Sequence, residues 1–565
     1  MRKDMSYSTV VTIRKDLELS FLLPFLLNFT YPTLIDKAVI TSGKPIPTET
    51  VKTENGLVSG VYNSDKSIKV FAGLPYATPP VGQLRWKAPQ PPKSWNGVRT
   101  ADHFSDCAMQ RKTPAFASKL LALSLGTSEF DNFTIKNNEA VSEDCLYLNV
   151  WTGSKSTNEH RPVIVFIHGG SFLTGAGSID AYNGEAMAKK GVVFVTLNYR
   201  LGIFGFMANP ELTRESETNS SGNYGILDQV AALKWIKNNI AGFGGDPNNV
   251  TIAGESAGSM CVNALVASPI TKGLFQRAIG ESGAIFGSRG VSGGLTQTLA
   301  QAERAGMKFA DSQKNASISD LRKMSSSYLL KVSKNLTTRP IIDGYLLPDT
   351  IYNIFAAGKQ NDVPVIIGNN SDEGSLFLTL PWPMKSAKNA DKFKSDVIMT
   401  YKDKADEFFK LYPSSTNSEA LKSQLDSGRN QWFAWHMHTW ANLQNQTGKS
   451  KVYYYYFDRV HPGPARMKKL GAYHSSEIAY AYSNLKFLGL PYTDTDKNLS
   501  DAMSSYWINF ATTGNPNGKG LPEWVAYDNQ KDQTLDLGAN IHTISIPDKT
   551  DFKFFDSYEA NLREK

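Results

Sequence analysis

The stretch that most constrains this chain runs from Asn249 to Met260. Its first part, Val250–Ala253, is a short apolar, β-branched run, which predicts a buried parallel strand. A Gly-x-Ser-x-Gly motif, Gly-Glu-Ser-Ala-Gly, follows at 254–258. In a sharp strand-to-helix turn, glycines on both sides of the serine let two backbone segments approach closely. Such a turn exposes the Ser256 hydroxyl at the end of the strand and leaves the N–H of Ala257 to meet a developing anion.

On its own the motif fits an ordinary turn equally well, because glycine, serine and alanine are common residues. Its surroundings favour a nucleophile. The apolar runs 162–170 and 192–199 predict two more buried strands, and 223–239 has the apolar spacing of a helix. Strands that alternate with helices predict a parallel sheet covered by helices on both faces.

Further short strands are expected toward the two ends of this sheet, at 56–60, 69–76, 363–368 and 451–457. The two N-terminal strands are expected to extend the sheet as antiparallel edge strands. Helical segments are expected at about 297–445 and 497–556, over the active edge of the sheet. The predicted fold class is α/β: one large, mostly parallel, twisted central sheet in a single domain over residues 51–560.

Residues 1–50 are interpreted as a secretory leader and linker. Four basic residues precede the apolar run Leu19–Leu27, as in a signal sequence, although Asp16 and Glu18 fit that pattern badly. The alternative is a structured or disordered N-terminal extension. The leader predicts a secreted, periplasmic or extracellular protein. No apolar run is long and uninterrupted enough to predict an integral membrane span.

Size and charge narrow the function further. A chain of 565 residues that is 41% hydrophobic can bury a large core. Its net charge of +7 is small for this length, and no long basic block is present, so nucleic acid is not an expected partner. The sequence gives no indication of the oligomeric state.

A serine nucleophile needs a base within hydrogen-bonding reach, and the base needs an acid that orients it. In an open parallel sheet these groups lie at the carboxyl ends of strands. Among the eight histidines, placement favours His474 over His461 as the base. Either Asp372 or Glu373 can supply the acid, because both follow the strand that ends near Ile367.

The order serine, carboxylate, histidine is that of the α/β-hydrolases. An oxyanion hole needs several N–H groups directed at one point. Gly169 and Gly170, at the end of the run 162–170, and Ala257 are predicted to supply them. No metal ion and no organic cofactor is implied by this arrangement.

The chain resembles the type-B carboxylesterases, the carboxylesterase and cholinesterase branch of the α/β-hydrolase fold. The resemblance extends from about Gly56 to beyond Asn517. Its motifs occur in order at 71–77, 84–86, 142–149, 168–172, 198–202, 243–247, 254–258, 372–374 and 474–477. It implies that Glu373 is the acid and His474 the base.

The resemblance also implies two structural pairs. Cys107 and Cys145 are expected to form the first disulfide of the family, and Arg85 is expected to pair with Glu143. The third cysteine, Cys261, is predicted to be a small hydrophobic residue of a buried helix.

Two residues are expected to support the triad without reacting: Ser282, which would support the acid, and Glu255, beside the nucleophile. Two departures from the family pattern bear on function. Ser171 follows Gly169-Gly170, where many members have glycine or alanine, and its N–H can serve equally well. The segment 107–145 contains no tryptophan, which argues against a cholinesterase because a choline ester would lose its cation–π partner.

The sequence therefore predicts a serine hydrolase that cleaves small-molecule carboxylic esters through an acyl-enzyme intermediate. Two alternatives remain. The chain could be a non-catalytic, cholinesterase-like adhesion protein, or it could apply the same chemistry to a lipid, lactone, thioester or amide.

Overall fold

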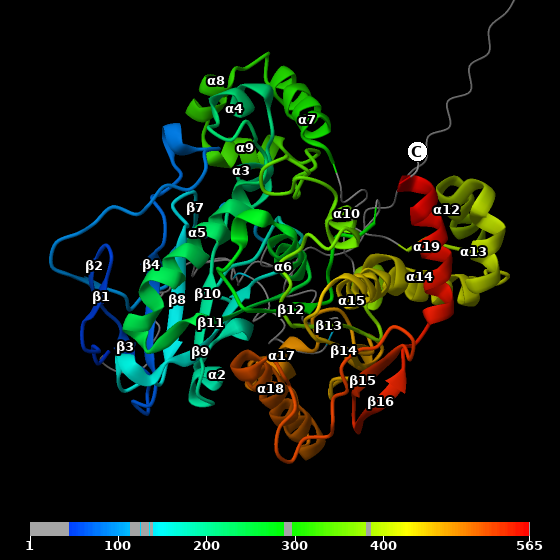
Figure 1. Ribbon diagram of the computed structural model, residues 1–565. Coiled ribbons are helices and arrows are strands. Elements are labelled where there is room, and N and C mark those ends of the chain that lie inside the picture. The colour runs from blue at the N-terminus through cyan, green and yellow to red at the C-terminus, as the bar shows by residue number, and fades with distance from the viewer. Residues whose placement is uncertain are drawn as a thin grey trace, which may run out of the picture. The chain divides into compact units, whose positions relative to one another are not determined.

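The computed structural model describes residues 45–113, 125, 135, 139–287, 297–379 and 386–563. Its main sheet has eleven strands (Figure 1). In spatial order they are β16 (Ile541–Ser545), β15 (Gln533–Leu537), β14 (Val452–Phe457), β13 (Val365–Asn370), β12 (Arg277–Glu281), β11 (Gly245–Glu255), β9 (Arg161–Ile167), β10 (Val193–Leu197), β8 (Tyr147–Thr152), β4 (Lys69–Pro75) and β3 (Val61–Tyr62). The pairings from β15 to β10 are parallel, and those at both ends are antiparallel.

The central strands are buried on both faces, which explains their continuous apolar sequences. Along β9, Val163, Val165 and Ile167 belong to one hydrophobic cluster, and Ile164 and Phe166 belong to another. Successive side chains of a strand point to opposite faces, so the two clusters lie on opposite sides of the sheet.

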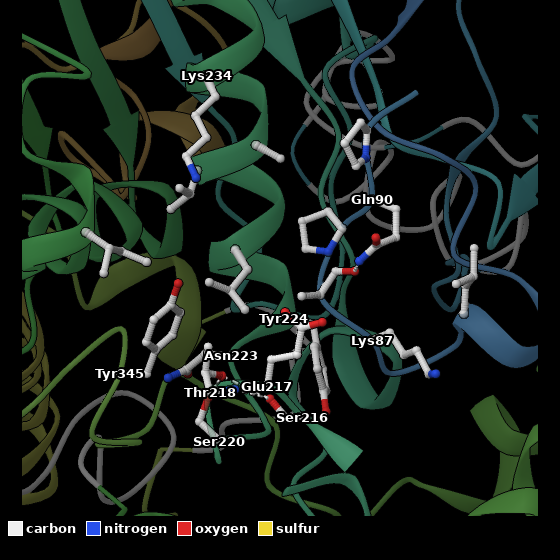
Figure 2. Close-up of a pocket in the computed structure, with 18 of the residues that line it drawn as sticks. Lys87, Gln90, Ser216, Glu217, Thr218, Ser220, Asn223, Tyr224, Lys234 and Tyr345 are labelled. Atoms are coloured by element: carbon white, nitrogen blue, oxygen red, sulfur yellow. Dashed lines mark hydrogen bonds between the residues drawn. The ribbon is translucent and has the colours of Figure 1, made fainter. Parts of the chain in front are cut away.

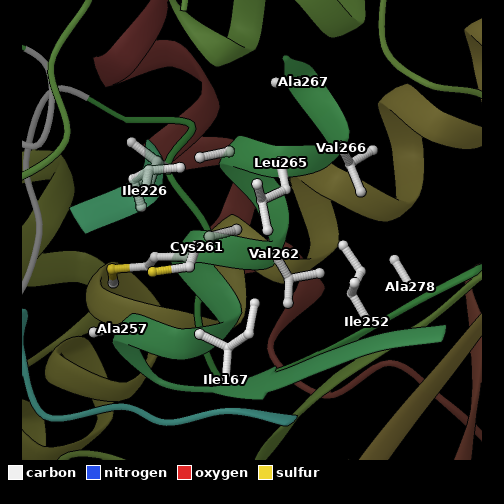
Figure 3. Packing of buried hydrophobic residues seen from close by; sticks show 14 of the residues in the cluster. Ile167, Ile226, Ile252, Ala257, Cys261, Val262, Leu265, Val266, Ala267 and Ala278 are labelled. Carbon is white, nitrogen blue, oxygen red and sulfur yellow. The ribbon is translucent and has the colours of Figure 1, made fainter. Parts of the chain in front are cut away.

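Helices cover both of these faces. The first cluster contains apolar side chains of α5 (Tyr224–Asn239) and α6 (Ala257–Ala267), and Figure 3 shows α6 within it. The second contains side chains of α18 (Asp494–Thr513). Cys261 of α6 is fully buried in the first cluster, as predicted. The predicted fold class is confirmed. Of the two predicted N-terminal edge strands, 69–76 joins the antiparallel end of the main sheet as β4, whereas 56–60 lies in a separate three-stranded sheet.

The other α-helices in the described part of the chain are α2 (Glu185–Lys189), α3 (Gly202–Phe206), α4 (Pro210–Glu215), α7 (Leu299–Ser312), α8 (Ile318–Lys323), α9 (Ser326–Val332), α10 (Ile351–Ala356), α11 (Ser375–Thr379), α12 (Ala390–Tyr401), α13 (Ala405–Leu411), α14 (Asn417–Arg429), α15 (Trp435–Thr447), α16 (Ala465–Lys468), α17 (Ile478–Ala481) and α19 (Lys549–Arg563). A π-helical turn, Asn430–Ala434, joins α14 to α15. Small sheets contain β1 (Val51–Thr53), β2 (Gly56–Ser59) and β5 (Val98–Thr100), and β6 (Cys107–Ala108) with β7 (Val141–Ser142). No helix in the described ranges combines the length and hydropathy needed to cross a bilayer.

The structure contradicts the predicted disulfide. Cys107 and Cys145 are both buried thiols rather than half-cystines. The Cys107 sulfur donates to Glu139 Oε2 at 3.2 Å, and Cys107 packs in the cluster on one face of the sheet. Cys145 packs in the cluster on the opposite face, where burial raises the pKa of its thiol. The two side chains therefore lie in separate apolar environments.

The other predicted pair is confirmed: Arg85 contacts Glu143 through two hydrogen bonds of 2.7 and 2.6 Å. The strands β15 and β16 were not predicted, since the sequence 533–545 mixes polar and apolar residues without a clear run. The predicted leader falls almost entirely outside the described residues, and the domain boundaries at 51 and 560 stay a prediction.

Candidate active site

The Gly-x-Ser-x-Gly motif forms the predicted turn between β11 and α6. Ser256 has φ 57° and ψ −124°, a conformation that L-residues rarely adopt. A Cβ atom on Gly258 would lie 2.0 Å from the carbonyl oxygen of Ile167, so only glycine fits where the helix crosses the end of β9. The N–H of Ser256 donates to the carbonyl of Glu281 at 2.8 Å. Ser256 is therefore held by the neighbouring strand β12, with its side chain half-buried.

His474 and Glu373 meet at the same edge of the sheet. His474 Nδ1 lies 2.6 Å from Glu373 Oε2, and both side chains are buried. The other oxygen of Glu373 accepts the N–H of Asn370 at 2.8 Å. The neighbouring carboxylate of Asp372 points elsewhere and accepts the N–H of Ala472 at 3.0 Å. Of the two acids that the sequence left open, Glu373 is the one that contacts the imidazole.

His461, the other candidate base, lies in a separate environment. It is buried, and its Nε2 lies 3.0 Å from the carbonyl oxygen of Ser476. Its Nδ1 lies 3.0 Å from the Tyr492 hydroxyl. Burial lowers the pKa of His461 to about 4, so this ring is neutral and both nitrogens are occupied. These contacts give His461 a structural role.

The second nitrogen of His474 faces Glu255. Nε2 lies 3.2 Å from Glu255 Oε1, which also accepts the Ser475 hydroxyl at 2.5 Å. Within the described residues, Nε2 has no hydrogen-bond partner, so the Ser256–His474 hydrogen bond is not formed in this structure. Catalytic hydrogen bonds often become short only when substrate binds.

Several carboxyl groups are buried behind the histidine. Burial raises the pKa of Glu255 to about 7 and that of Glu281 to about 8. Burial and the neighbouring carboxylates also raise the pKa of Glu477 well above its usual value. Burial opposes the charged form of His474, but the carboxylates of Glu255 and Glu373 outweigh it, so the pKa of His474 is raised above 6.5.

Two of the three predicted oxyanion residues, Gly169 and Ala257, lie beside Ser256. A Cβ atom on Gly169 would lie 3.0 Å from Ser256 Cβ and 2.7 Å from the carbonyl oxygen of Glu255. Ala257 is the first residue of α6, where a helix leaves its N–H groups unpaired. In the part of the chain that the structure describes, the N–H groups of Gly169, Gly170 and Ala257 have no acceptor.

The loop after β9 has a feature that the sequence did not predict. Gly170, Ser171 and Phe172 all have positive φ values, of 106°, 57° and 61°. Two consecutive non-glycine residues in the left-handed region store strain, and such strain clusters at functional sites.

The two supporting residues differ in what the structure shows. Glu255 contacts His474 and Ser475, as described above. Ser282 has φ 53°, and its N–H donates to Gly368 at 2.9 Å. Its buried hydroxyl has no hydrogen-bond partner among the described residues, including Glu373. Support of the acid by the Ser282 hydroxyl therefore stays a prediction.

Three residues around His474 were missed from the sequence: Ser475, Phe377 and Phe433. Phe433 and Phe377 lie against the imidazole, with ring centres 4.4 and 5.1 Å away. Phe433 lies on the π-helical turn, where ordinary helical spacing does not apply. Ser475 adjoins the predicted base, but nothing in its sequence position indicates the contact with Glu255.

A cleft of about 770 Å³ lies elsewhere, between α5 and the proline-rich segment 88–92. Figure 2 shows Lys234 of α5 and Gln90 of that segment at its wall. None of Ser256, Glu373 and His474 lines it, so cavity size does not locate these three residues. Within the described ranges, no group of three or more His, Cys, Asp or Glu side chains is arranged to hold a metal ion.

Comparison with known proteins gives the family. The model of the carboxylesterase family matches residues 47–555. The chain is 36% identical over 516 residues to the para-nitrobenzyl esterase of Bacillus subtilis (strain 168), covering 88% of this chain and 96% of the relative. It is 34% identical over 536 residues to liver carboxylesterase 1 of Oryctolagus cuniculus, covering 88% and 91%.

Solved structures agree with the sequence relatives. A PNB esterase superposes with a TM-score of 0.75 at 34% identity, covering 90% of this chain and 99% of the other. A thermophilic PNB esterase gives the same TM-score, identity and coverage. The chain therefore belongs to the carboxylesterase family, and it is a carboxylic ester hydrolase with the α/β-hydrolase fold.

Proposed function

We propose that Ser256, His474 and Glu373 form the catalytic triad of this esterase. His474 accepts the proton of the Ser256 hydroxyl as its oxygen attacks the acyl carbon of the ester. His474 then donates that proton to the departing alcohol, leaving an acyl-enzyme on Ser256. Water, deprotonated by the same imidazole, attacks the acyl carbon. The bond from that carbon to Ser256 Oγ then breaks, His474 returns the proton to Oγ, and the carboxylate leaves.

One observation carries this proposal: the 2.6 Å contact between His474 Nδ1 and Glu373, beside the strained turn that presents Ser256. The carboxylate fixes the proton on Nδ1, so that Nε2 is the nitrogen able to accept a proton. Glu373 also favours the imidazolium that forms during attack.

The oxyanion of the tetrahedral intermediate is proposed to bind the N–H groups of Gly169, Gly170 and Ala257. Their lack of acceptors and the closeness of Gly169 to Ser256 support this assignment. Donors aimed at the developing charge each stabilise the transition state by about 2.7–4 kcal/mol.

Small-molecule carboxylic esters are the proposed substrates, as the names of the para-nitrobenzyl esterase and of the human cocaine esterase suggest. The cocaine esterase is 34% identical over 524 residues. Thioesters are a second candidate. The medium-chain fatty acyl-CoA hydrolase precursor of Anas platyrhynchos is 34% identical over 520 residues. A panel of p-nitrophenyl esters and acyl-CoA thioesters of graded acyl length distinguishes the two classes.

The nucleophile is tested with Ser256→Ala. Turnover of p-nitrophenyl butyrate is expected to fall about 10⁶-fold, with the thermal unfolding midpoint retained. Ser327→Ala, which changes an exposed serine on α9, is the control and keeps full activity. Retained turnover in Ser256→Ala would refute the assignment.

A further inference from the structure

The π-helical turn between α14 and α15 carries an aromatic side chain to the proposed base. A π turn inserts one residue into a helix and so shifts the side chains that follow, and such turns are frequent at functional sites. Phe433, in the turn Asn430–Ala434, is 1% exposed. Its ring stacks on the imidazole of His474, with centres 4.4 Å apart and planes 29° apart.

The last residue of α14, directly before the turn, is anchored to the loop that carries the acid. Arg429 Nη1 donates to the carbonyl oxygen of Ser371 at 3.0 Å, two residues before Glu373. Arg429 also forms an ion pair with Asp548. One short segment therefore contacts both the loop of the acid and the ring of the base.

A second anchor fixes the turn to the C-terminal helix. The Asn430 side-chain amide donates to the Tyr412 hydroxyl at 3.0 Å and to Asp551 Oδ2, on α19, at 3.1 Å. These bonds are buried or partly buried, so the turn is held in place independently of Phe433 itself.

We propose that Phe433 is a positioning residue for His474: its ring stacks on one face of the imidazole and keeps Nδ1 on Glu373 while Nε2 stays available to Ser256. The inference rests on the proposed function, since it assumes that His474 is the base.

One feature makes such a restraint necessary. Glu373 faces Nδ1 and Glu255 faces Nε2, so the imidazole has a carboxyl group at each nitrogen and could rotate without losing charge pairing. A stacked face limits rotation about the Cβ–Cγ bond and also favours the imidazolium that forms during attack.

Phe433→Leu tests the proposal, because leucine fills much of the space without an aromatic face. We expect kcat for p-nitrophenyl butyrate to fall about tenfold, with KM changed less than twofold. The acidic limb of the kcat/KM profile is expected to move to lower pH, because loss of the aromatic face destabilises the imidazolium. Phe433→Tyr keeps the face and is expected to restore most of kcat.

Phe243→Leu is the matched control. Phe243 is 2% exposed and packs edge-to-face on Phe71 with ring centres 4.9 Å apart, and its aromatic contacts include neither the triad nor the anchors of the turn. Its replacement is expected to lower stability similarly while leaving kcat and the pH profile unchanged.

If Phe433→Leu has the same kcat, KM and pH profile as the parent protein, the positioning role is wrong. If Phe433→Leu does not fold, Phe433→Met decides in the same way. The proposed function is judged separately: if Ser256→Ala stays active, the triad itself is wrong, whereas an inactive Ser256→Ala beside an unaffected Phe433→Leu refutes only this inference.

Discussion

Replacement of Glu373 by glutamine tests the orientation of the base. In the protein, Glu373 Oε1 accepts the N–H of Asn370 at 2.8 Å, and Oε2 faces His474 Nδ1 at 2.6 Å. In Glu373→Gln the amide oxygen must keep the bond to Asn370, because an amide NH₂ cannot accept it. The NH₂ group then faces Nδ1, which forces the imidazole proton onto Nε2.

An imidazole protonated at Nε2 cannot take the proton of Ser256. The matching change in a serine protease lowers kcat about 10⁴-fold, which at about 1.36 kcal/mol per tenfold is about 5.4 kcal/mol of transition-state stabilisation. We expect a loss of this size for Glu373→Gln, measured as kcat for p-nitrophenyl butyrate. Stability should change little, because the substitution removes a buried charge from a site that contains other carboxyl groups.

Asp372→Asn is the neighbouring control. Asp372 accepts the N–H of Ala472 and does not contact His474. The Asp372→Asn variant should therefore lose far less activity than Glu373→Gln. If Glu373→Gln keeps activity within tenfold of the parent, or if Asp372→Asn is the variant that loses 10⁴-fold, the assignment of the acid is wrong.

Two further predictions concern pH and stability. The raised pKa of His474 keeps its imidazole protonated to higher pH, so kcat/KM should rise with pH through a midpoint above 6.5. A midpoint below pH 6.5 would contradict the pairing of His474 with carboxylates. Arg200 and Asp228 form a buried ion pair with an Nη2–Oδ1 distance of 2.6 Å and side chains 3% and 0% exposed. Asp228→Ala should lower the free energy of unfolding, measured in urea titrations, by about 3–5 kcal/mol, because it leaves a buried guanidinium without its partner. Adding Arg200→Met to that variant should recover part of the lost stability.

The central sheet could be predicted because its strands are buried on both faces. Continuous apolar runs such as 162–167 predict strands without any knowledge of tertiary contacts. The last two strands were missed for different reasons: β15 buries the polar Thr534 and Asp536 between its leucines, so its sequence has no apolar run, and little of the edge strand β16 is buried. The disulfide was predicted only from the resemblance to the family. Nothing in the sequence around the two cysteines indicates that they pack in clusters on opposite faces of the sheet.

The triad followed from chain order and from the carboxyl ends of strands, but the choice between Asp372 and Glu373 needed the resemblance. Adjacent residues in a loop point in different directions, and only tertiary geometry decides which one faces the histidine. The contacts of His474 with Glu255 and Phe433 could not be predicted either. Phe433 depends on a π-helical turn about 40 residues before the base, and one extra residue in a helix leaves no distinct spacing in the sequence.

The most direct test of the serine mechanism is to label the protein with diisopropyl fluorophosphate and to map the modified peptide by mass spectrometry. The triad predicts one adduct, on Ser256, with loss of esterase activity in proportion to labelling. An adduct on another residue that tracks the loss of activity, or full activity on a protein labelled at Ser256, would contradict it.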